Sequence, residues 1–600
     1  MFQKYKKCRA KPTIWHNLSF FNGKRGNTYF CDMENSFEAS QPSMDQLSFD
    51  NFRQAILQDY RWVCISRETS LMGRKEVLTG KAKFGIFGDG KEVAQVAMAK
   101  FFQPGDFRSG YYRDQTFAFA SGLATVEQFF AQLYADPDIT HDPFSAGRQM
   151  NAHFATPFVD ADGTFLNLAQ RKNISSDIAP TAGQMVRGLG LAFASKCFRN
   201  IKELESFSNL SNKGNEVCFC TIGDASTSEG QFWETINAAG VLQVPLVVFV
   251  WDDGYGISVP KEYQTTKASI SDVLSGFQKE DGTNGFQIYK VKGWDYASLC
   301  EAFEEGVRHA RETHTPVLFH VEEITQPQGH STSGSHERYK SAERLEWERA
   351  WDGLVKMREW IIENALASDE ELADIEQEAK LFVRDSKNKA WEAYLAPIKQ
   401  QVSRVVDGIA GLASQLPEQT TELEKISKEL SGIREPLRRN VMHALHAALN
   451  IAGNSDAAFR LRDYYNDLKK EAKALYNSHL YNEGPTSALR VVEVPAQISD
   501  DAPIVNGYEV LNKYFDALFA ANSKVVAFGE DLGNIGDVNQ GFSGLQAKYG
   551  AERIFDTGIR ELTIMGQGIG LAMRGLRPIA EIQYPVYLLY GLQPLSDDVA

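Results

Sequence analysis

Two aspartates near the middle of the chain, Asp224 and Asp253, are the residues whose type and spacing point most directly to chemistry. Each closely follows a short apolar run, Val217–Ile222 or Val244–Val250, that predicts a buried strand. Glu229–Leu242, between these runs, carries a helical pattern, so the segment predicts a βαβ unit with parallel neighbouring strands. We therefore expect the two carboxylates to lie together at the carboxyl edge of an α/β sheet, where open sheets bind ligands.

Two carboxylates beside a helix N-terminus suit a diphosphate that is bound through magnesium. Mg²⁺ prefers hard oxygen donors and is usually completed by phosphate oxygens and water. The backbone N–H groups of Ala225–Ser228, at the start of the predicted helix, can bind a phosphate directly. The alternative is an ordinary α/β turn with surface aspartates, which turn chemistry also favours. The pattern alone leaves these two interpretations evenly balanced.

The whole stretch Val217–Ser258 resembles the thiamine diphosphate motif, in which Gly-Asp-Gly is followed further along by a pair of Asn residues. Its Ser-Glu-Gly after the turn and its final Gly-Tyr-Gly-Ile-Ser are similar to the α part of the decarboxylating component of 2-oxo acid dehydrogenase complexes. The resemblance implies that Asp224, Asp253 and the backbone carbonyl of Tyr255 hold Mg²⁺. It also implies three further cofactor-binding residues in the same turn: Gly223, Ala225 and Ser226.

The motif departs from the family pattern at two places. Ala225 stands where the motif has its second Gly, and Asp252-Asp253 replaces the Asn pair. Asp253 keeps a ligand oxygen but adds a negative charge beside an anionic diphosphate. We expect the affinity for the cofactor to suffer unless neighbouring cations compensate for this charge.

The same resemblance assigns four residues elsewhere in the first half of the chain. Arginine suits a diphosphate because its planar guanidinium donates two parallel hydrogen bonds. Tyr112 and Arg113 match a Tyr-Arg pair of the family, although Arg113 could instead be a surface residue paired with Asp114. Ser176 and Ile178 also match cofactor-binding positions, and Ile178 matches the aliphatic residue that props the cofactor in its bent shape.

A segment rich in Gly and Ser, Gln328–His336, predicts a mobile surface loop, and such loops often carry catalytic residues. Within it, His330-Ser331 resembles the active-site His-Ser of the family. A neutral imidazole at His330 can move a proton or hydrogen-bond a reacting oxygen. His336 has no matching role, and we expect it to be structural.

The substrate prediction depends on one further segment. Gly147–Met150, followed by His153-Phe154, resembles the entrance loop of the branched-chain members more than that of the pyruvate members. This favours 2-oxoisovalerate and other branched-chain 2-oxo acids, with pyruvate or acetoin dehydrogenase as the alternative.

The end of the chain resembles the start of the β part of the same enzymes, continuously from about residue 504. Glu561 matches the glutamate that hydrogen-bonds the aminopyrimidine ring of the cofactor, and Tyr587 matches an aromatic position that lies against that ring. In the family the β part continues well beyond this length. We therefore expect a fused α–β protein with an incomplete β part, and no turnover of a 2-oxo acid by these 600 residues alone.

Size and composition limit the remaining possibilities. Six hundred residues with 43% hydrophobic side chains predict several domains, and a net charge of −15 argues against nucleic acid or an anionic membrane as the partner. Seven cysteines are too few for a disulfide scaffold, and no run of eighteen apolar residues predicts a spanning helix. A bacterial cytoplasm fits these features better than a mitochondrial matrix.

We predict an α/β fold of the thiamine diphosphate-binding type in four segments. These are an unassigned basic segment at 1–48, an α-part domain at 49–400, a helical connector at 401–503 and the start of a β-part domain at 504–600. The basic segment is either a transit peptide or, as we favour, an over-long start before Met33 or Met44.

The resemblance implies an enzyme that uses thiamine diphosphate and Mg²⁺ to decarboxylate a 2-oxo acid. It also implies transfer of the acyl group to a lipoyl-lysine of the partner acyltransferase, with the fused chains assembled as a homodimer. A non-catalytic assembly subunit is the rival interpretation, because the Asp pair departs from the motif.

Overall fold

The computed structural model describes residues 49–598 except 479, 483 and 486, so the predictions for residues 1–48 lie outside the described part of the chain. Its largest element is a parallel sheet of six strands in the order β2-β1-β3-β4-β8-β7. The strands are β1 (Phe107–Ser109), β2 (Asn173–Ile174), β3 (Cys218–Gly223), β4 (Leu246–Trp251), β7 (Gln287–Lys292) and β8 (Val317–Glu322). The predicted βαβ unit is confirmed, because β3 and β4 are parallel neighbours joined by α7 (Gly230–Leu242).

Helices cover both faces of this sheet, because alternate strand residues point to opposite sides. Phe219 of β3 packs in one hydrophobic core, whereas Cys218 and Cys220 pack in the other. The first core includes residues of α2 (Phe49–Leu78), α3 (Glu92–Ala99), α4 (Gln115–Ala120), α5 (Val126–Leu133), α9 (Tyr296–Thr313), α11 (Gly353–Glu363) and part of α12 (Asp369–Gln415). The second includes residues of α6 (Gly183–Asn200), α7 and α8 (Ile270–Val273). A parallel sheet covered on both faces is the predicted fold class, and it is confirmed.

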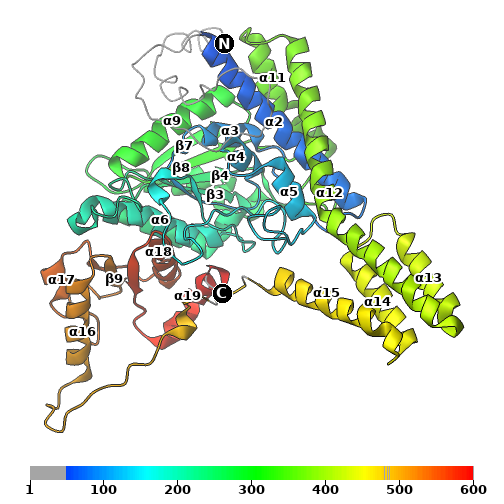
Figure 1. Ribbon diagram of the computed structural model, residues 1–600. Coiled ribbons are helices and arrows are strands. Elements are labelled where there is room, and N and C mark those ends of the chain that lie inside the picture. Colours follow the sequence, from blue (N-terminus) through cyan, green and yellow to red (C-terminus); the bar gives the residue numbers. More distant parts are fainter. Residues whose placement is uncertain (1–48, 479, 483, 486, 599–600) are drawn as a thin grey trace.

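Helix α12 leaves the sheet and supports a projecting helical arm (Figure 1). The arm continues with α13 (Thr420–Ser431), α14 (Arg438–Ala452) and α15 (Phe459–Asn477) and has a hydrophobic core of its own. Because α12 runs through residue 400 without a break, the predicted boundary at 400/401 falls inside a helix. No helix of the described residues is both long and apolar enough to span a membrane.

Apolar residues at spacings of three and four from Trp347 to Ile361 predict one amphipathic helix, and this prediction is wrong. The structure has two helices there, α10 (Ala342–Ala350) and α11. Asp352 interrupts the helix because its carboxylate accepts a hydrogen bond from the backbone N–H of Leu354 at 3.0 Å and pairs with Arg67 at 3.0 Å.

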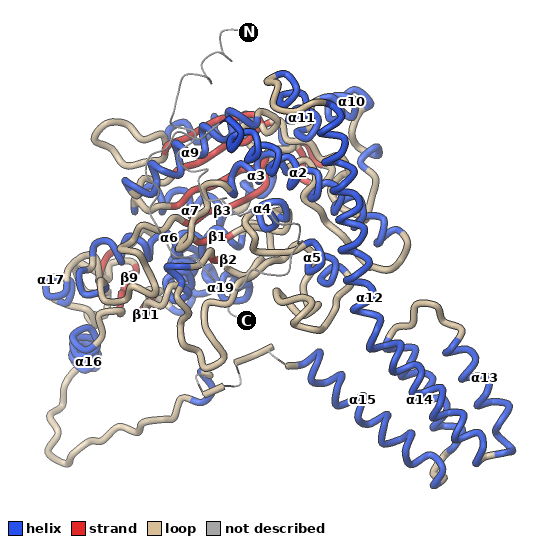
Figure 2. Tube along the Cα trace, turned by 45° about the horizontal axis from the view of Figure 1, so that its top comes forward, coloured by secondary structure: helices blue, strands red, loops and turns tan. Residues whose placement is uncertain are grey.

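After an extended tether, visible in Figure 2, the chain forms a second, smaller parallel sheet in the order β10-β9-β11. Its elements are α16 (Gly507–Ala521), β9 (Val525–Gly529), α17 (Leu545–Tyr549), β10 (Ile554–Asp556), α18 (Glu561–Met573), β11 (Arg577–Ala580) and α19 (Leu588–Asp598). Ile564 and Leu571 of α18 share the hydrophobic core of α6, so this part packs directly on the larger sheet unit.

Helices α6 and α18 cross at a very short distance. A Cβ atom on Gly190 would lie 2.3 Å from the carbonyl oxygen of Gln567, and one on Gly570 would lie 2.3 Å from that of Arg187. Next to this crossing, the buried guanidinium of Arg574 pairs with Glu216 at 2.9 Å and donates to the carbonyl of Leu191 at 3.0 Å. Close backbone contact and a buried ion pair therefore fix α18 on α6.

Candidate active site

The predicted site residues of the larger sheet unit lie at or after the carboxyl ends of its parallel strands. Such ends meet along one edge of a sheet, which is where α/β sheets bind ligands. Tyr112 and Arg113 follow β1, Ser176 and Ile178 follow β2, Asp224 follows β3, Asp253 follows β4, and His330 follows β8.

Asp224 is buried at the start of a 3₁₀ turn, Ala225–Ser228, with an exposed fraction of only 7%. Its Oδ2 atom has no hydrogen-bond partner. Burial, and then the negative charges of Asp253 and Asp252, raise the pKa of Asp224 well above its usual value. Buried carboxylates with an unpartnered oxygen are costly unless a ligand satisfies them, so this geometry favours a bound cation.

Ala225, the first departure from the motif, packs against the loop that carries Tyr255. A Cβ atom on Gly256 would lie 2.9 Å from the Cβ of Ala225. The glycine at 256 therefore leaves room for the side chain that the motif lacks at 225.

Each residue of the Asp pair has a lysine partner. The ammonium of Lys91 lies 3.1 Å from Oδ2 of Asp253, and that of Lys261 lies 2.9 Å from Oδ2 of Asp252. Burial alone would raise the pKa of Asp252, but the hydrogen bond from His320 and the charge of Lys261 outweigh it and lower this pKa to about 2. Asp252 is therefore ionised at neutral pH, and its Oδ1 atom, like Oδ2 of Asp224, has no hydrogen-bond partner.

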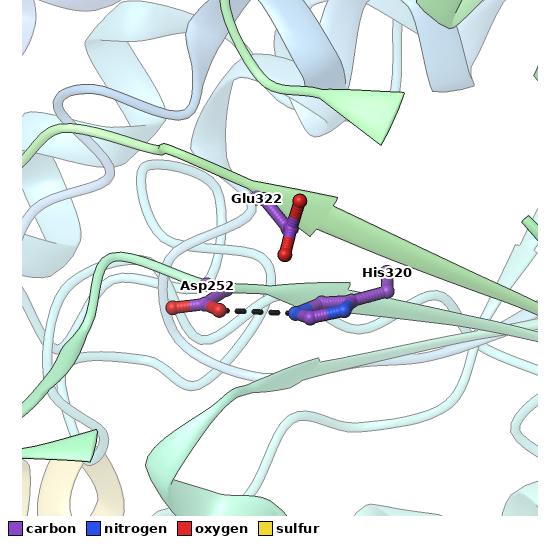
Figure 3. Close-up of side chains that lie close together, drawn as sticks. All are labelled: Asp252, His320 and Glu322. Carbon is purple, nitrogen blue, oxygen red and sulfur yellow. Dashed lines mark hydrogen bonds and ion pairs between the residues drawn. The ribbon is translucent and has the colours of Figure 1, made fainter. Parts of the chain in front are cut away.

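Asp252 also ends a chain of buried side chains, of which Figure 3 draws the bond between Asp252 and His320. Nε2 of His320 lies 3.0 Å from Oδ2 of Asp252, and Nδ1 of His320 lies 2.8 Å from Oγ of Ser271. Ligand atoms of Asp252, His320 and Glu322 lie within 4.8 Å of one another. Lys261 already binds Asp252, however, and Lys290 binds Glu322 at 3.0 Å. Because these carboxylates are already paired, we interpret the cluster as support for Asp252 and not as a separate metal site.

Arg113 is buried and does not pair with Asp114, so the surface-residue alternative is wrong. One guanidinium nitrogen donates to the carbonyl of Phe87 at 2.7 Å. The other donates to the carbonyl of His330 at 2.9 Å and lies 3.0 Å from its Nδ1 atom. Asp114 pairs instead with Arg108. The sequence could not show this, because Arg113 directly precedes Asp114 in the chain and only the fold brings Arg108, six residues away, onto its carboxylate.

His330 is partly buried and is held by Arg113. Burial, and then the neighbouring guanidinium, lower the pKa of His330 to about 4. The imidazole is therefore neutral at pH 7 and has one free nitrogen for a ligand. His336 lies further along the same loop, and its Nδ1 atom has no hydrogen-bond partner.

The remaining α-part residues differ in their exposure. The ring of Tyr112 stacks on His153 with 6.1 Å between ring centroids. Ile178 is buried, close to the start of α6 at Gly183. Ser176 is exposed, and its carbonyl accepts a hydrogen bond from Arg187.

Glu561 and Tyr587 lie on the second, smaller sheet unit. Glu561 is buried in the first turn of α18, and two residues later the backbone N–H of Thr563 donates to Glu234 of α7 at 3.1 Å. This bond places the start of α18 beside the helix that follows the Asp224 turn. Tyr587 has an exposed fraction of 39% and contacts Tyr584, with 5.6 Å between ring centroids.

Sequence reasoning missed four residues of this cluster: Lys91, Lys261, His320 and Arg344. Arg344 of α10 donates to the backbone carbonyl of Asp253 at 3.0 Å and lies over the ring of Tyr255. The only sequence signal for these residues was the Asp pair, Asp252-Asp253, because its negative charge requires cations nearby. The sequence does not identify those cations.

These residues fit a diphosphate bound through Mg²⁺. The unpartnered oxygens of Asp224 and Asp252 are hard donors suited to Mg²⁺. Lys91 and Lys261 offset the negative charges of Asp253 and Asp252, and the guanidinium of Arg113 provides positive charge for a diphosphate.

The fold and this cluster define a class: a parallel α/β protein with a site for a metal-bound diphosphate at its carboxyl edge. Comparison with known families agrees. Residues 60–399, more than half of the chain, match the family described as dehydrogenase E1 component. Residues 505–600 match the transketolase pyrimidine-binding domain. The chain therefore belongs to the dehydrogenase E1 component family, and the two matches indicate thiamine diphosphate as its cofactor, with Mg²⁺ as the usual accompanying ion.

The individual relatives include proteins named for 2-oxoisovalerate and proteins named for pyruvate. The chain is 28% identical to the 2-oxoisovalerate dehydrogenase subunit alpha of Bacillus subtilis over 323 residues, which is 53% of this chain and 86% of that protein. It is 26% identical to the pyruvate dehydrogenase E1 component subunit alpha of Rickettsia bellii over 203 residues, 34% of this chain and 55% of that protein. It is also 26% identical to the mitochondrial 2-oxoisovalerate dehydrogenase subunit alpha of Caenorhabditis elegans over 303 residues, which is 50% of this chain and 61% of that protein.

Proposed function

We propose that this protein is the decarboxylating component of a 2-oxo acid dehydrogenase complex, with the site residues predicted from its sequence. The observation that carries the proposal is the buried cluster of Asp224, Asp252 and Asp253, in which two oxygens have no partner while Lys91 and Lys261 pair with Asp253 and Asp252. When bound, thiamine diphosphate supplies an electron sink for the loss of carbon dioxide from a 2-oxo acid.

The protein's own residues have three tasks in this proposal. Asp224, Asp253 and the carbonyl of Tyr255 hold Mg²⁺, and Arg113 donates to the diphosphate. Residues that line the cofactor are Tyr112, Ser176, Ile178, Gly223, Ala225, Ser226 and Tyr587. Glu561 hydrogen-bonds the aminopyrimidine ring and sets its tautomer.

His330 acts at the reacting end. It is neutral at pH 7 because its pKa is lowered to about 4, and since Nδ1 accepts from Arg113, its proton lies on Nε2, which can donate a hydrogen bond to a reacting oxygen. Arg113 holds the backbone carbonyl of His330 and lies beside its Nδ1 atom, which fixes the imidazole beside the diphosphate. We assign to His330 the transfer of the acyl group to a lipoyl-lysine of the partner acyltransferase.

For the substrate we favour 2-oxoisovalerate and other branched-chain 2-oxo acids. The support is the segment Gly147–Met150 with His153-Phe154, which resembles the entrance loop of the branched-chain members more than that of the pyruvate members. His153 nearby is buried, has a free Nε2 atom and stacks on Tyr112. Pyruvate is the second candidate, because some relatives carry that name. We also infer a homodimer of fused chains in a bacterial cytoplasm.

Two measurements test this proposal. Thiamine diphosphate with Mg²⁺ should quench tryptophan fluorescence saturably, because Trp251 directly precedes Asp252. The rival, a non-catalytic assembly subunit, predicts no change in fluorescence. Turnover of 2-oxoisovalerate against pyruvate by the intact natural protein, with a dye as electron acceptor, then identifies the substrate.

A further inference from the structure

Lys91 is a buried lysine whose charge directly faces the unusual aspartate of the motif. Its side chain has an exposed fraction of 1%, and its ammonium lies 3.1 Å from Oδ2 of Asp253. The other carboxylate oxygen, Oδ1, accepts the backbone N–H of Tyr255 at 3.2 Å. Fully buried lysines are rare because losing water is costly, so such a residue needs a partner or a function.

The turn that carries Lys91 is fixed against the segment that leads to His330. Gly90 has a φ of +89°, and a Cβ atom on it would lie 1.8 Å from the carbonyl oxygen of Thr325. The carboxylate of Asp89 accepts the backbone N–H of Gln328 at 2.9 Å. Lys91 itself precedes α3 and makes no side-chain capping bond there. Its side chain is therefore free of a helix-capping role and is placed toward Asp253 by a rigid turn.

The negative charge of Asp253 explains why a lysine at position 91 matters. An amide at residue 253 needs no counter-charge, whereas a carboxylate brings a second negative charge beside that of Asp252, which already takes Lys261 as its partner at 2.9 Å. A diphosphate brings more negative charge than one Mg²⁺ ion neutralises. Without a further cation, the second carboxylate of the Asp pair would repel the ligand that it has to anchor.

We propose that Lys91 is a positioning residue that neutralises Asp253, so that an aspartate at this place can bind a magnesium-bound diphosphate. The inference rests on the proposed function of the same site. It makes Lys91 and Asp253 one unit: the lysine matters for binding because residue 253 is an aspartate. A lysine that served only to stabilise the fold would not show this dependence.

The test is a double-mutant cycle on ligand binding with Lys91→Met, Asp253→Asn and the double variant. The probe is the 1:1 complex of Mg²⁺ with inorganic pyrophosphate, because this complex is a net anion and contains only the metal-bound diphosphate part of the ligand. Isothermal titration calorimetry gives the dissociation constants. Lys292→Met is the matched control, since Lys292 is 42% exposed and pairs with Glu323 at 2.6 Å.

We expect Lys91→Met to weaken pyrophosphate binding about 10- to 30-fold, a coupling within the range known for contacting residues. Asp253→Asn should bind no more weakly than the parent. The double variant, which removes both charges, should bind within about threefold of the parent. The control should be unchanged.

Two results would overturn the inference. One is unchanged affinity in Lys91→Met, and the other is a double variant as weak as Lys91→Met alone. If Lys91→Met fails to fold, the affinities of the double variant and of Asp253→Asn are compared instead. Similar affinities support the inference. A double variant that binds pyrophosphate much more weakly than Asp253→Asn would show that Lys91 binds the ligand directly, and would overturn it. Failure of the parent itself to bind thiamine diphosphate with Mg²⁺ would instead refute the proposed function.

Discussion

Replacing Arg574 by methionine should loosen the smaller sheet unit from the larger one. Arg574 is 1% exposed and makes three polar contacts across the interface: with Glu216 at 2.9 Å, Ser195 at 3.0 Å and the carbonyl of Leu191 at 3.0 Å. Methionine retains the apolar length of the side chain over the ring of Phe107 but donates no hydrogen bond.

The expected cost follows from what the substitution leaves behind. Breaking a buried ion pair by removing one partner typically costs ~3–5 kcal/mol, because the other charge stays buried. After the substitution, the carboxylate of Glu216 still accepts a hydrogen bond from the hydroxyl of Ser211 at 2.7 Å. We therefore expect a cost at the lower end of this range, about 3 kcal/mol. At ~1.4 kcal/mol for each factor of ten, this corresponds to roughly 100-fold in the opening equilibrium.

Hydrogen exchange measured by mass spectrometry reports this local opening. Peptides from α18 should lose about 100-fold in protection, whereas peptides from α7 should not. Arg577→Met is the control, because Arg577 is exposed and donates only to the carbonyl of Leu576. Adding Glu216→Met to Arg574→Met should recover much of the protection, since both charges are then gone. Unchanged protection of α18 in Arg574→Met would refute the reasoning.

Three further predictions concern single residues. Asp224→Ala should abolish magnesium-dependent binding of thiamine diphosphate, measured by calorimetry, because it removes a buried metal ligand; wild-type affinity would mean that the motif is misread. His330→Ala should spare cofactor binding but slow acyl transfer to a lipoyl acceptor ~10²–10⁴-fold in the intact protein, and equal rates would exclude His330 from the mechanism. Burial, and then Arg199, lower the pKa of His314 to about 4. Below about pH 6.5, His314 therefore binds a proton in the unfolded chain but stays neutral in the folded chain. The free energy of unfolding should fall by ~2 kcal/mol from pH 7 to pH 5. His314→Asn should remove this part of the pH dependence in urea unfolding, and an unchanged dependence would contradict the assignment.

The sequence predicted the sheet edge well because strands of a parallel sheet are apolar runs that end at polar turns. β3 and β4 were each predicted to within about two residues. The small residues from Gly566 to Met573 predict a helix, but α18 begins five residues earlier, at Glu561, because polar residues in its first turn hide the helical pattern. The partners of the Asp pair could not be predicted, since Lys91 is far from Asp253 in sequence and only the fold brings them together.

The glycine contacts between α6 and α18 also determine where the chain can change in length. A single inserted residue between Glu561 and Gly570 would rotate the start of α18 by about 100° relative to the crossing. Either Glu561 would leave its place, or a larger side chain would meet the backbone of α6. The tether before α16 has no such limit, because Val494 and Ile504 within it are almost fully exposed. Insertions and deletions are therefore expected to be tolerated in the tether and to be excluded from the first half of α18.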